Sequence, residues 1–314
     1  MKISTCIITY NHEPFLRKCL DGAISQKLNC EYEIIIGEDF STDKTLDICK
    51  EYQLKYPNII RLLPSNKNYG MMGNWLRTIS ECKGKYIAIC EGDDYWTDSM
   101  KLQKQVDYLN ANKEYSFVFT PALIDKSSIK KLRNRYDKFD SNNFNLENVL
   151  KLGGGFYPTL TALFDSEILK TENNFLKLHS TADYPLAILA ALRGKIGYID
   201  DVTGVYRVQN NSLSNKLYDN CHQCSNAAKS KFIKNISFFE FLFSEIEVNS
   251  ELKRELISKE SYVLLSKYLD CGNYSSALSA LFSSKLLFKH LTRIITKFIY
   301  VLTFRMKSIK IKQL

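Results

Sequence analysis

Three acidic side chains within four residues form the strongest chemical feature of the sequence. Residues 90–96 read CEGDDYW and directly follow the apolar segment 86–90. The ionised carboxylates of Glu91, Asp93 and Asp94 repel one another at this spacing, so they call for a compensating cation. Mg²⁺ and Mn²⁺ prefer such oxygen ligands and complete their shells with phosphate oxygens. The cluster predicts a divalent metal site, with an acidic solvated turn as the alternative.

A second acidic segment, GEDFSTD at residues 37–43, also ends an apolar run. Its last three residues, 41–43, are typical of a helix N-cap with acidic residues in the first turn. That interpretation leaves Glu38 and Asp39 unexplained. A carboxylate at the end of a strand is placed to accept hydrogen bonds from a nucleobase or a ribose.

The third segment is TADYPL at residues 181–186. Asp183 lies near an expected helix start, where the helix dipole favours a negative charge. On spacing alone that structural interpretation competes with a catalytic one.

The elements that must position these side chains follow an alternating order. Apolar, β-branched segments predict strands at residues 3–9, 32–37, 59–63 and 86–90. Helical patterns separate them at residues 14–26, 41–55 and 75–82. This order predicts a parallel sheet covered by helices. Ligands bind at the carboxyl ends of the strands in such sheets, and the acidic segments follow strands.

The rest of the chain is organised less clearly. Residues 125–148 are polar and predict a loop or an insertion, and an apolar pattern resumes at 156 and continues to about 207. Residues 250–283 predict a helical hairpin with a break at 271–273.

The charge of the chain is concentrated at its end. The formal net charge is +9, and residues 285–314 contain eight Lys or Arg and no Asp or Glu. Residues 1–284 are nearly neutral. This argues against a nucleic-acid binder, because such proteins usually carry positive charge on their folded surface. Within the tail, basic residues recur every fourth position, at Lys285, Lys289, Arg293 and Lys297. This pattern predicts an amphipathic helix on an anionic membrane surface, with packing on the protein's own core or a dimer contact as alternatives.

The cysteines and the N-terminal segment indicate the cellular compartment in which the protein is expected. The nine Cys residues are scattered and several lie in apolar runs, which predicts buried thiols in a reducing compartment. The CHQC segment at 221–224 has the spacing of half a zinc site, but no second pair follows it. Neither a signal peptide nor an uninterrupted apolar stretch of membrane-spanning length is expected.

Taken in order, these segments resemble the inverting family 2 glycosyltransferases with the GT-A fold. The resemblance covers residues 2–210 and rests on TYN at 9–11, EDFSTD at 38–43, GKYI at 84–87, EGDDYW at 91–96, ADYPL at 182–186, GKIGYI at 194–199 and GVYR at 204–207. Each segment is weak alone, whereas the ordered set is specific. It implies an α/β fold with a mostly parallel sheet flanked by helices and a C-terminal helical appendage.

The resemblance also implies roles for donor-binding residues. Thr9 and Asp39 match positions that hold the base of a nucleotide-sugar donor. Glu91 and Asp93 match acidic positions that contact the donor. The donor implied by the family is a UDP-sugar.

Metal and catalytic roles follow in the same way. Asp94 and Asp93 match the metal-binding Asp-x-Asp-type motif for Mn²⁺ or Mg²⁺, with Asp94 as the direct ligand. Many relatives have a metal-binding His where this chain has Gln209, whose carbonyl oxygen is a weaker ligand. Asp183 matches the catalytic base.

The implied organisation is a glycosyltransferase domain at residues 1–215, with a donor-binding half at 1–120 and an acceptor half at 150–215. A helical region at 216–284 and the basic membrane-associating tail at 285–314 follow. The implied reaction is metal-dependent inverting transfer of a sugar to a glycan or polyprenyl-linked acceptor in surface polysaccharide synthesis. The expected location is cytoplasmic, peripheral on the inner face of the cell membrane, without a nucleic-acid partner.

Two other classes of function remain open. A nucleotidyltransferase also uses an α/β sheet and acidic metal ligands, but the TYNH segment at 9–12 is not the Gly-rich basic loop expected near its first strand. A peripheral membrane protein with a degenerate transferase fold is the non-enzymatic alternative, and the three intact acidic segments argue against it.

Overall fold

The computed structural model describes residues 2–63, 65–126, 129–132, 144–169, 175–208, 221–283, 286–287 and 290–297. The chain divides into two compact units, which are described separately. Unit 1 comprises residues 1–177 and 181–209, and unit 2 comprises residues 178–180 and 210–314. The predicted metal ligand Gln209 and the tail beyond residue 297 lie outside the described residues.

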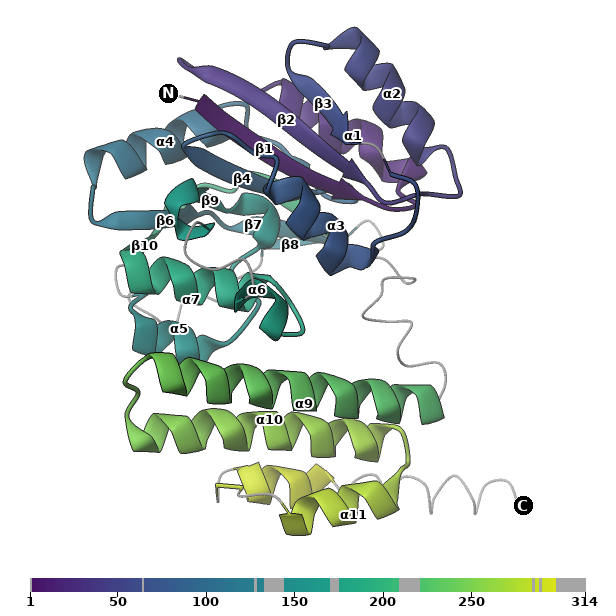
Figure 1. The fold of residues 1–314 in the computed structure, drawn as a ribbon, viewed down its shortest axis with the longest axis vertical. Coiled ribbons are helices and arrows are strands. Elements are labelled where there is room, and N and C mark those ends of the chain that lie inside the picture. The colour runs from purple at the N-terminus through teal and green to yellow at the C-terminus, as the bar shows by residue number, and fades with distance from the viewer. Residues whose placement is uncertain are drawn as a thin grey trace. The chain divides into compact units, whose positions relative to one another are not determined.

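Unit 1 is built on a seven-stranded sheet with the order β10-β6-β9-β4-β1-β2-β3 (Figure 1). Its strands are β1 (Lys2–Thr9), β2 (Glu31–Glu38), β3 (Ile60–Leu63), β4 (Tyr86–Glu91), β6 (Tyr115–Phe119), β9 (Leu163–Asp165) and β10 (Lys195–Tyr198). The four strands β1 to β4 are mutually parallel, as are β6 and β10. Strand β9 runs antiparallel to both of its neighbours, β4 and β6. The predicted mostly parallel sheet flanked by helices is confirmed.

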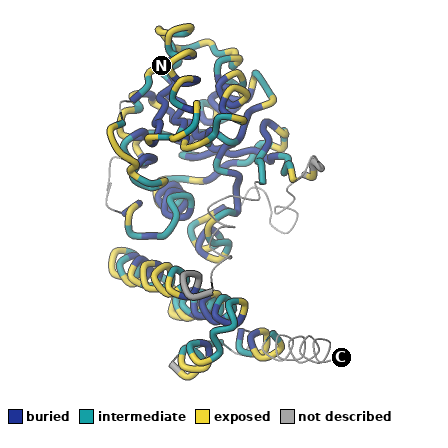
Figure 2. The backbone as a smooth tube through the Cα atoms, turned by 90° about the vertical axis from the view of Figure 1, so that its right-hand side faces the viewer, coloured by how far each residue is buried: buried dark blue, intermediate teal, exposed yellow. Residues whose placement is uncertain are grey.

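Helices cover both faces of this sheet. They are α1 (Glu13–Ile24), α2 (Thr45–Lys55), α3 (Gly70–Ile79), α4 (Lys101–Ala111), α5 (Leu146–Leu152), α6 (Phe175–Leu178) and α7 (Asp183–Arg193), with short 3₁₀ turns η1 (Thr159–Thr161) and η2 (Ser166–Leu169). Residues on one face of β1 and β2 pack in a core with α1, α2 and α4, namely Ile3, Ile7, Ile34 and Ile36. The residues that alternate with them, such as Ser4, Cys6 and Ile35, are buried on the other face. This alternation is what a strand period of two produces, and Figure 2 shows the strands as the buried centre of the unit.

The opposite face is covered by α3, which approaches β2 very closely at Gly37. A Cβ atom at Gly37 would lie 1.8 Å from the Thr78 hydroxyl oxygen and 2.8 Å from the Asn74 side-chain oxygen. The Asn74 amide donates to the Gly37 carbonyl at 2.7 Å. Glycine is therefore the residue that lets this helix dock next to the end of β2.

A smaller, four-stranded sheet has the order β5-β11-β7-β8. Its strands are β5 (Tyr95–Trp96), β7 (Ala122–Lys126), β8 (Ile129–Leu132) and β11 (Gly204–Arg207). The sequence predicted a loop or an insertion from residue 125, but β8 pairs antiparallel with β7. The prediction was wrong for this hairpin because its strand is short and Lys-rich, as edge strands often are.

The starts of α1 and α2 cap each other. The Asp43 carboxylate accepts hydrogen bonds from the backbone N–H of Glu13 (3.1 Å) and of Thr45 (2.9 Å). The Thr45 hydroxyl accepts from the His12 N–H at 2.8 Å, and the Glu13 carboxylate accepts from the Lys44 N–H at 3.2 Å. The sequence had assigned residues 41–43 to the cap of their own helix alone, and this was incomplete.

Unit 2 contains α9 (Cys221–Glu245), α10 (Ser250–Asp270) and α11 (Tyr274–Ser283). Helices α9 and α10 lie side by side (Figure 1), and the turn between α10 and α11 contains Gly272 at φ +69°. Residues 290–297 are helical, and Ile294 is 3% exposed in a core formed with Leu265 and Leu269. Within the described part of the chain, no helix has the length and apolarity needed to cross a bilayer.

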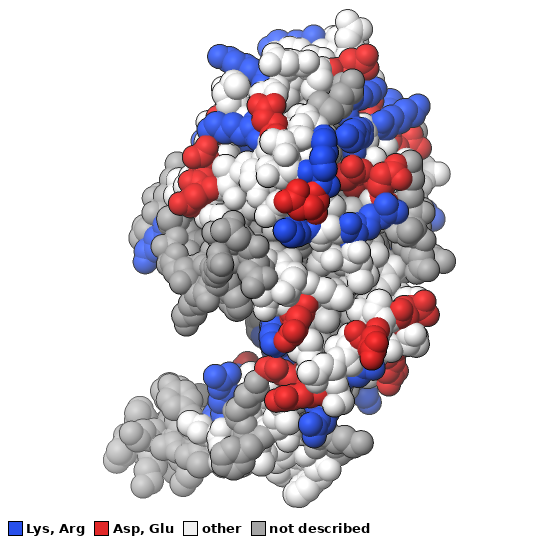
Figure 3. Space-filling model, turned by 90° about the vertical axis from the view of Figure 1, so that its left-hand side faces the viewer, with Lys and Arg blue, Asp and Glu red and all other residues white. Residues whose placement is uncertain are grey.

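The described surface carries charges of both signs. On the face drawn in Figure 3, Lys and Arg side chains are interspersed with Asp and Glu side chains. An example is the bidentate pair of Arg17 with Glu51, at 2.7 Å.

We predict that Asp43→Ala lowers the free energy of unfolding by about 1–2 kcal/mol, because it removes a cap from two helices at once. Urea denaturation at pH 7 measures this, with exposed Lys50→Ala as the control expected within about 0.5 kcal/mol of wild type. An Asp43→Ala midpoint equal to that of the control would contradict the shared cap.

The same interaction predicts a pH dependence. Although burial acts in the opposite direction, the hydrogen bonds from Thr45 and Glu13 lower the pKa of Asp43 below its ordinary value. The stabilisation is therefore complete above the ordinary carboxyl range, near pH 4, and is lost as the pH falls through the lower folded value. The stability difference between wild type and Asp43→Ala should shrink in acid. A difference that stays constant down to pH 2 would argue against it.

Candidate functional site

The parallel strands β1, β2 and β4 all end on the same side of the large sheet. This side, where the C-terminal ends of the three strands meet, is called the carboxyl edge below. Their register pairs Thr9 with Glu38 and Ile8 with Glu91. The predicted residues Thr9, Asp39 and Glu91 therefore lie at neighbouring strand ends, although they are far apart in sequence. This is the edge at which a doubly wound sheet binds its ligands.

The turn after β4 packs directly on the end of β1. The Gly92 N–H donates to the Ile8 carbonyl at 2.9 Å, and a Cβ atom at Gly92 would lie 2.7 Å from the Thr9 hydroxyl oxygen and 2.9 Å from His12 Nδ1. A side chain at position 92 would therefore displace Thr9 or His12. The absence of a Cβ brings the acidic turn into contact with the first strand.

Asp94 joins the acidic turn to the smaller sheet. Its side chain is buried, and Oδ1 accepts from the backbone N–H of Arg207 in β11 at 2.8 Å. The Arg207 guanidinium donates to the Asp93 carbonyl at 2.7 Å and lies 4.3 Å from the ring centroid of Tyr95. Sequence reasoning did not anticipate that Arg207 fixes this turn, because 113 residues separate it from Asp94.

The electrostatics of the turn favour a cation. Burial raises the pKa of Glu91 to about 7, repulsion from Asp93 and Asp183 adds to it, and a hydrogen bond with Thr159 acts in the opposite direction. Burial, followed by repulsion from Asp93 and Glu91, also raises the pKa of Asp94 well above its usual range. Ionising both carboxyl groups is therefore unfavourable until a positive charge is nearby.

Four buried polar atoms around this edge have no hydrogen-bond partner among the residues that the structure describes. They are Thr9 Oγ1, His12 Nδ1, Glu91 Oε2 and Asp183 Oδ1. Thr9 and His12 both border Gly92, and Asp183 is close enough to Glu91 to raise the pKa of that carboxyl group. Because an unpaired buried polar atom costs free energy, their convergence indicates a place for a polar ligand.

Asp183, the first residue of α7, lies beside a glycine-rich loop. A Cβ atom at Gly154 would lie 3.3 Å from Asp183 Oδ2, and Gly153 and Gly155 have φ +73° and +76°. The Tyr157 hydroxyl donates to the Asp183 carbonyl at 2.9 Å, which fixes the helix start. A side chain at position 154 would therefore crowd the Asp183 carboxylate.

Asp39 follows β2 in a turn that other side chains hold. The Glu38 carboxylate accepts from the N–H groups of Ser41 (2.7 Å) and Phe40 (3.2 Å), and Phe40 adopts φ +61°. Asp39 Oδ1 accepts from the Tyr69 N–H at 2.7 Å. Glu38, which the sequence left open as a ligand contact, therefore stabilises its own turn, while Asp39 joins this turn to the segment before α3.

Sequence reasoning missed two polar residues at this edge. His12 Nε2 lies 3.9 Å from Asp93 Oδ2, and burial lowers the pKa of His12, which favours the neutral ring. Thr159 contacts Glu91 from η1. The position of His12 at the start of an expected helix after a strand was a usable signal, whereas Thr159 had none. Among the described residues, no group of three His, Cys, Asp or Glu side chains is arranged to hold a metal ion.

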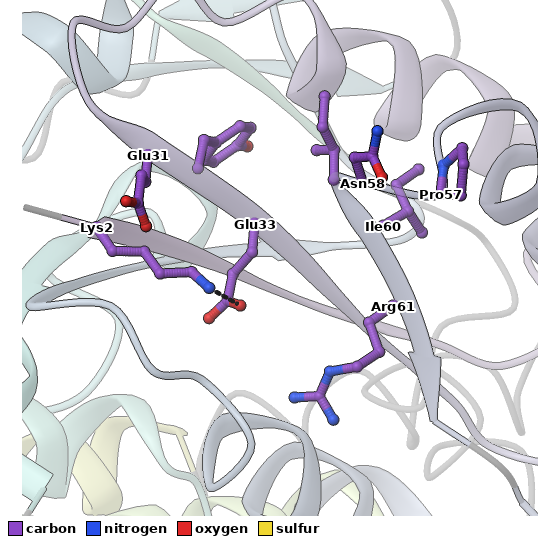
Figure 4. Close-up of a pocket in the computed structure, with 9 residues that line it drawn as sticks. Lys2, Glu31, Glu33, Pro57, Asn58, Ile60 and Arg61 are labelled. Atoms are coloured by element: carbon purple, nitrogen blue, oxygen red, sulfur yellow. Dashed lines mark ion pairs between the residues drawn. The ribbon is translucent and has the colours of Figure 1, made fainter.

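A hollow of about 370 Å³ lies at the other edge of the sheet, where β1, β2 and β3 begin (Figure 4). Lys2 and Glu33 pair across it at 2.6 Å, and Arg61 lies on its wall. Because the amino-terminal ends of the strands form it, this hollow is distinct from the acidic edge described above.

Two solved structures resemble this chain in fold. Residues 1–349 of TarS from S. aureus align over 96% of this chain and 81% of that chain, with TM-score 0.57 and 16% sequence identity. The mannosyltransferase PcManGT from Pyrobaculum calidifontis, solved with GDP-Man and Mn²⁺, aligns over 96% and 80%, with TM-score 0.58 and 16% identity. At these identities the likeness establishes the GT-A fold.

Curated relatives match part of the chain. An uncharacterized protein of Mycobacterium tuberculosis is 41% identical over 122 residues, 39% of this chain. The dTDP-rhamnosyl transferase RfbG of Shigella flexneri is 40% identical over 111 residues, 33% of this chain. The matched parts are only 35% and 38% of the length of these two relatives.

The family comparison covers more of the molecule. The model of glycosyl transferase family 2 matches residues 4–172, which is more than half of the chain. That segment contains the ends of β1, β2 and β4 and the acidic turn between Glu91 and Asp94. The chain belongs to glycosyl transferase family 2.

Proposed function

We propose that this protein transfers a sugar from a nucleoside diphosphate sugar to a hydroxyl group of a glycan or polyprenyl-linked acceptor, with inversion at the anomeric carbon. The observation that carries the proposal concerns one buried oxygen on each of Thr9, Glu91 and Asp183 at the carboxyl edge of the sheet. None of the three has a hydrogen-bond partner among the described residues. Thr9 supplies a contact for the nucleotide-sugar donor, Glu91 belongs to the acidic turn, and Asp183 is a separate carboxylate. Direct displacement needs these three groups.

The donor is proposed to be a UDP-sugar held by Thr9 and Asp39. A carboxylate at Asp39 accepts the imide N–H that uracil presents, and the unpartnered Thr9 hydroxyl is a neighbouring polar contact. TarS has been solved with UDP-GlcNAc, which supports a donor of this class for the shared fold. Glu91 and Asp93 lie next to these residues and complete the donor site.

The residues fit a divalent cation that the donor brings with it. Nucleotide-bound Mg²⁺ is held by one or two carboxylates together with phosphate oxygens and water, so three protein ligands are not required. Asp94 and Asp93 provide hard oxygen donors whose mutual repulsion a cation offsets. Mn²⁺ or Mg²⁺ bound there acts as a Lewis acid that stabilises the charge on the leaving diphosphate. Gln209 stays a candidate further ligand.

Asp183 is proposed as the catalytic base. Its Oδ1 is buried without a hydrogen-bond partner among the described residues, and Gly154 places no side chain against the carboxylate. The carboxylate takes the proton of the acceptor hydroxyl as that oxygen attacks the anomeric carbon. Because one displacement replaces the leaving group from the opposite side, the configuration inverts.

Residues beyond 297 are proposed to bind the cytoplasmic face of the cell membrane. In the described part of the tail, Ile294 is buried in unit 2 and Lys297 pairs with Asp270 at 2.8 Å, whereas Arg293 is exposed. The described helix at residues 290–297 therefore packs on the protein, as one of the alternative predictions for the tail expected. Residues 298–314 carry four further basic side chains between apolar ones, which favours an anionic lipid surface.

We predict that Asp94→Asn abolishes most metal-dependent transfer. Asn keeps an oxygen to accept from the Arg207 N–H but loses the charge, so turnover should fall by two orders of magnitude or more, about 3 kcal/mol. Transfer is assayed over a panel of nucleotide sugars with Mn²⁺ titration, and Mn²⁺ affinity is measured with UDP present. The control is exposed Asp47→Asn. Full transfer by Asp94→Asn in EDTA would refute the metal role.

We predict that Asp183→Asn stops transfer with little effect on donor binding, because the base acts only in the transition state. The measurement is kcat for transfer together with calorimetric affinity for UDP. Asp201→Asn, which loses only a surface ion pair with Lys104, serves as the control. If Asp183→Asn transfers sugar at the wild-type rate, another group is the base.

We predict that deleting residues 298–314 releases the protein from anionic liposomes while preserving hydrolysis of a soluble donor. Sedimentation with phosphatidylserine vesicles measures binding, and high salt should weaken it for the intact chain. The cut preserves the core contact of Ile294 and the Lys297 ion pair. Equal sedimentation of the truncated and intact chains would show that the tail is not the anchor.

A further inference from the structure

The turn after β2 is held from α3 by contacts that the proposed chemistry does not use. The Arg77 guanidinium donates from Nη2 to the Glu38 carbonyl at 2.6 Å and from Nε to Asn74 Oδ1 at 2.9 Å. Its Cζ atom lies 4.8 Å from the centroid of the Tyr69 ring. Arg77 therefore joins three parts of the fold: the end of β2, the body of α3 and the residue that precedes this helix.

The segment before α3 in turn fixes Asp39, which is 2% exposed. The Tyr69 N–H donates to Asp39 Oδ1 at 2.7 Å, and the Asn68 side-chain amide donates to the Asp39 carbonyl at 3.0 Å. The N–H of Asp39 itself donates to the Thr9 carbonyl at 3.0 Å. The backbone of Asp39 is thus held at both its N–H and its carbonyl. Because Oδ1 is engaged within the protein, Oδ2 is the oxygen that can face a ligand.

A carboxylate that presents one oxygen distinguishes between nucleobases. The imide edge of uracil or thymine has a single N–H between two carbonyl oxygens, so one carboxylate oxygen fits it and a second would be repelled by a neighbouring carbonyl. Guanine presents two adjacent donors, N1–H and the 2-amino group, which pair best with both oxygens of a carboxylate. Engagement of Oδ1 by the Tyr69 N–H therefore favours the imide edge.

We propose that Tyr69 and Arg77 are positioning residues that clamp Asp39 with Oδ2 toward the base, and that this clamp selects a donor containing uracil or thymine over one containing guanine. The inference rests on the proposed function, in which Asp39 binds the base. Tyr69 acts through its backbone N–H, and Arg77 acts through the Glu38 carbonyl and the Tyr69 ring. The physical basis is that selectivity is a difference of two affinities, which a fixed orientation of one acceptor changes unequally.

The first test measures the orientation of the side chain at position 39. In Asp39→Asn the Tyr69 N–H should keep the amide oxygen at the Oδ1 position, which places the amide NH₂ group at the Oδ2 position. That group repels the uracil N–H and suits the N3 acceptor of cytosine. Calorimetry with UDP and CDP in the presence of Mn²⁺ should therefore show UDP affinity lowered by about tenfold or more and CDP affinity raised. An unchanged preference for UDP over CDP would overturn the clamp.

The second test loosens the clamp. Arg77→Met keeps an unbranched apolar side chain against Tyr69 but removes the donors to Glu38 and Asn74. UDP affinity should fall by about tenfold, whereas GDP affinity should change less than about twofold, so the preference for UDP narrows. At saturating donor, kcat should stay within about twofold of wild type, because the clamp acts on the ground state and the transition state alike. An equal loss of affinity for UDP and GDP, or a loss confined to kcat, would show a general structural role and overturn the inference.

Arg61→Met is the matched control, because Arg61 is exposed and its hydrogen bonds go to Glu81. It should bind UDP and GDP with the wild-type affinities. Thermal unfolding shows whether Arg77→Met is folded at the temperature of the measurement. If that variant is unfolded, the preference of Asp39→Asn between UDP and CDP decides the inference.

The outcomes separate this inference from the proposed function. A wild-type chain that transfers sugar but binds GDP as tightly as UDP and dTDP would overturn the inference and leave glycosyl transfer standing. A wild-type chain that transfers no sugar from any donor of the panel would contradict the proposed function and, with it, this inference.

Discussion

The burial of ionisable carboxyl groups at the end of β4 is the constraint around which unit 1 is organised. Glu91 and Asp94 are taken out of water next to Asp93, which raises the pKa of both groups. The protein offsets only part of that cost, through the Arg207 N–H on Asp94 and the Thr159 hydrogen bond on Glu91. Under the proposed function, a bound cation would offset the rest of that cost in free energy.

The same edge requires unusual backbone geometry, and polar side chains stabilise it. Asn11 and Phe40, each just after a strand, adopt φ +53° and +61°, which non-glycine residues rarely do. The Asn11 side-chain oxygen accepts from the Thr42 N–H at 2.8 Å, and Glu38 holds the turn at Phe40. Together with the shared cap formed by Asp43, these contacts join the loop after β1 to the loop after β2. Thr9 and Asp39 are therefore held in fixed positions next to each other.

Unit 2 shows how one sequence pattern serves two purposes. An apolar stripe with basic residues at every fourth position suits a lipid surface and also suits packing on neighbouring helices. Ile294 is buried against α10, and Lys297 pairs with Asp270. Periodicity predicts the helix, but only the partner face determines what covers its apolar side.

The sequence by itself determined the parallel α/β order, the family and the position of the acidic groups at strand ends. These features follow from local patterns, because strand alternation, turns and motifs are encoded within a few neighbouring residues. Even there, the Lys-rich strand β8 was missed, since its pairing with β7 rather than its own composition makes it a strand.

Tertiary structure alone decided which acidic residues are structural and which are left free. The Asp43 carboxylate accepts a hydrogen bond from the N–H of Glu13, 30 residues away in the sequence. The backbone N–H of Arg207 donates to Asp94, which is 113 residues away. Nothing local distinguishes these carboxylates from Asp183, because hydrogen-bond partners are chosen by the folded arrangement. Likewise, Lys101 looks like a surface residue of an amphipathic helix, and only the folded arrangement, with Trp96 and Gln105 around it, buries its amino group.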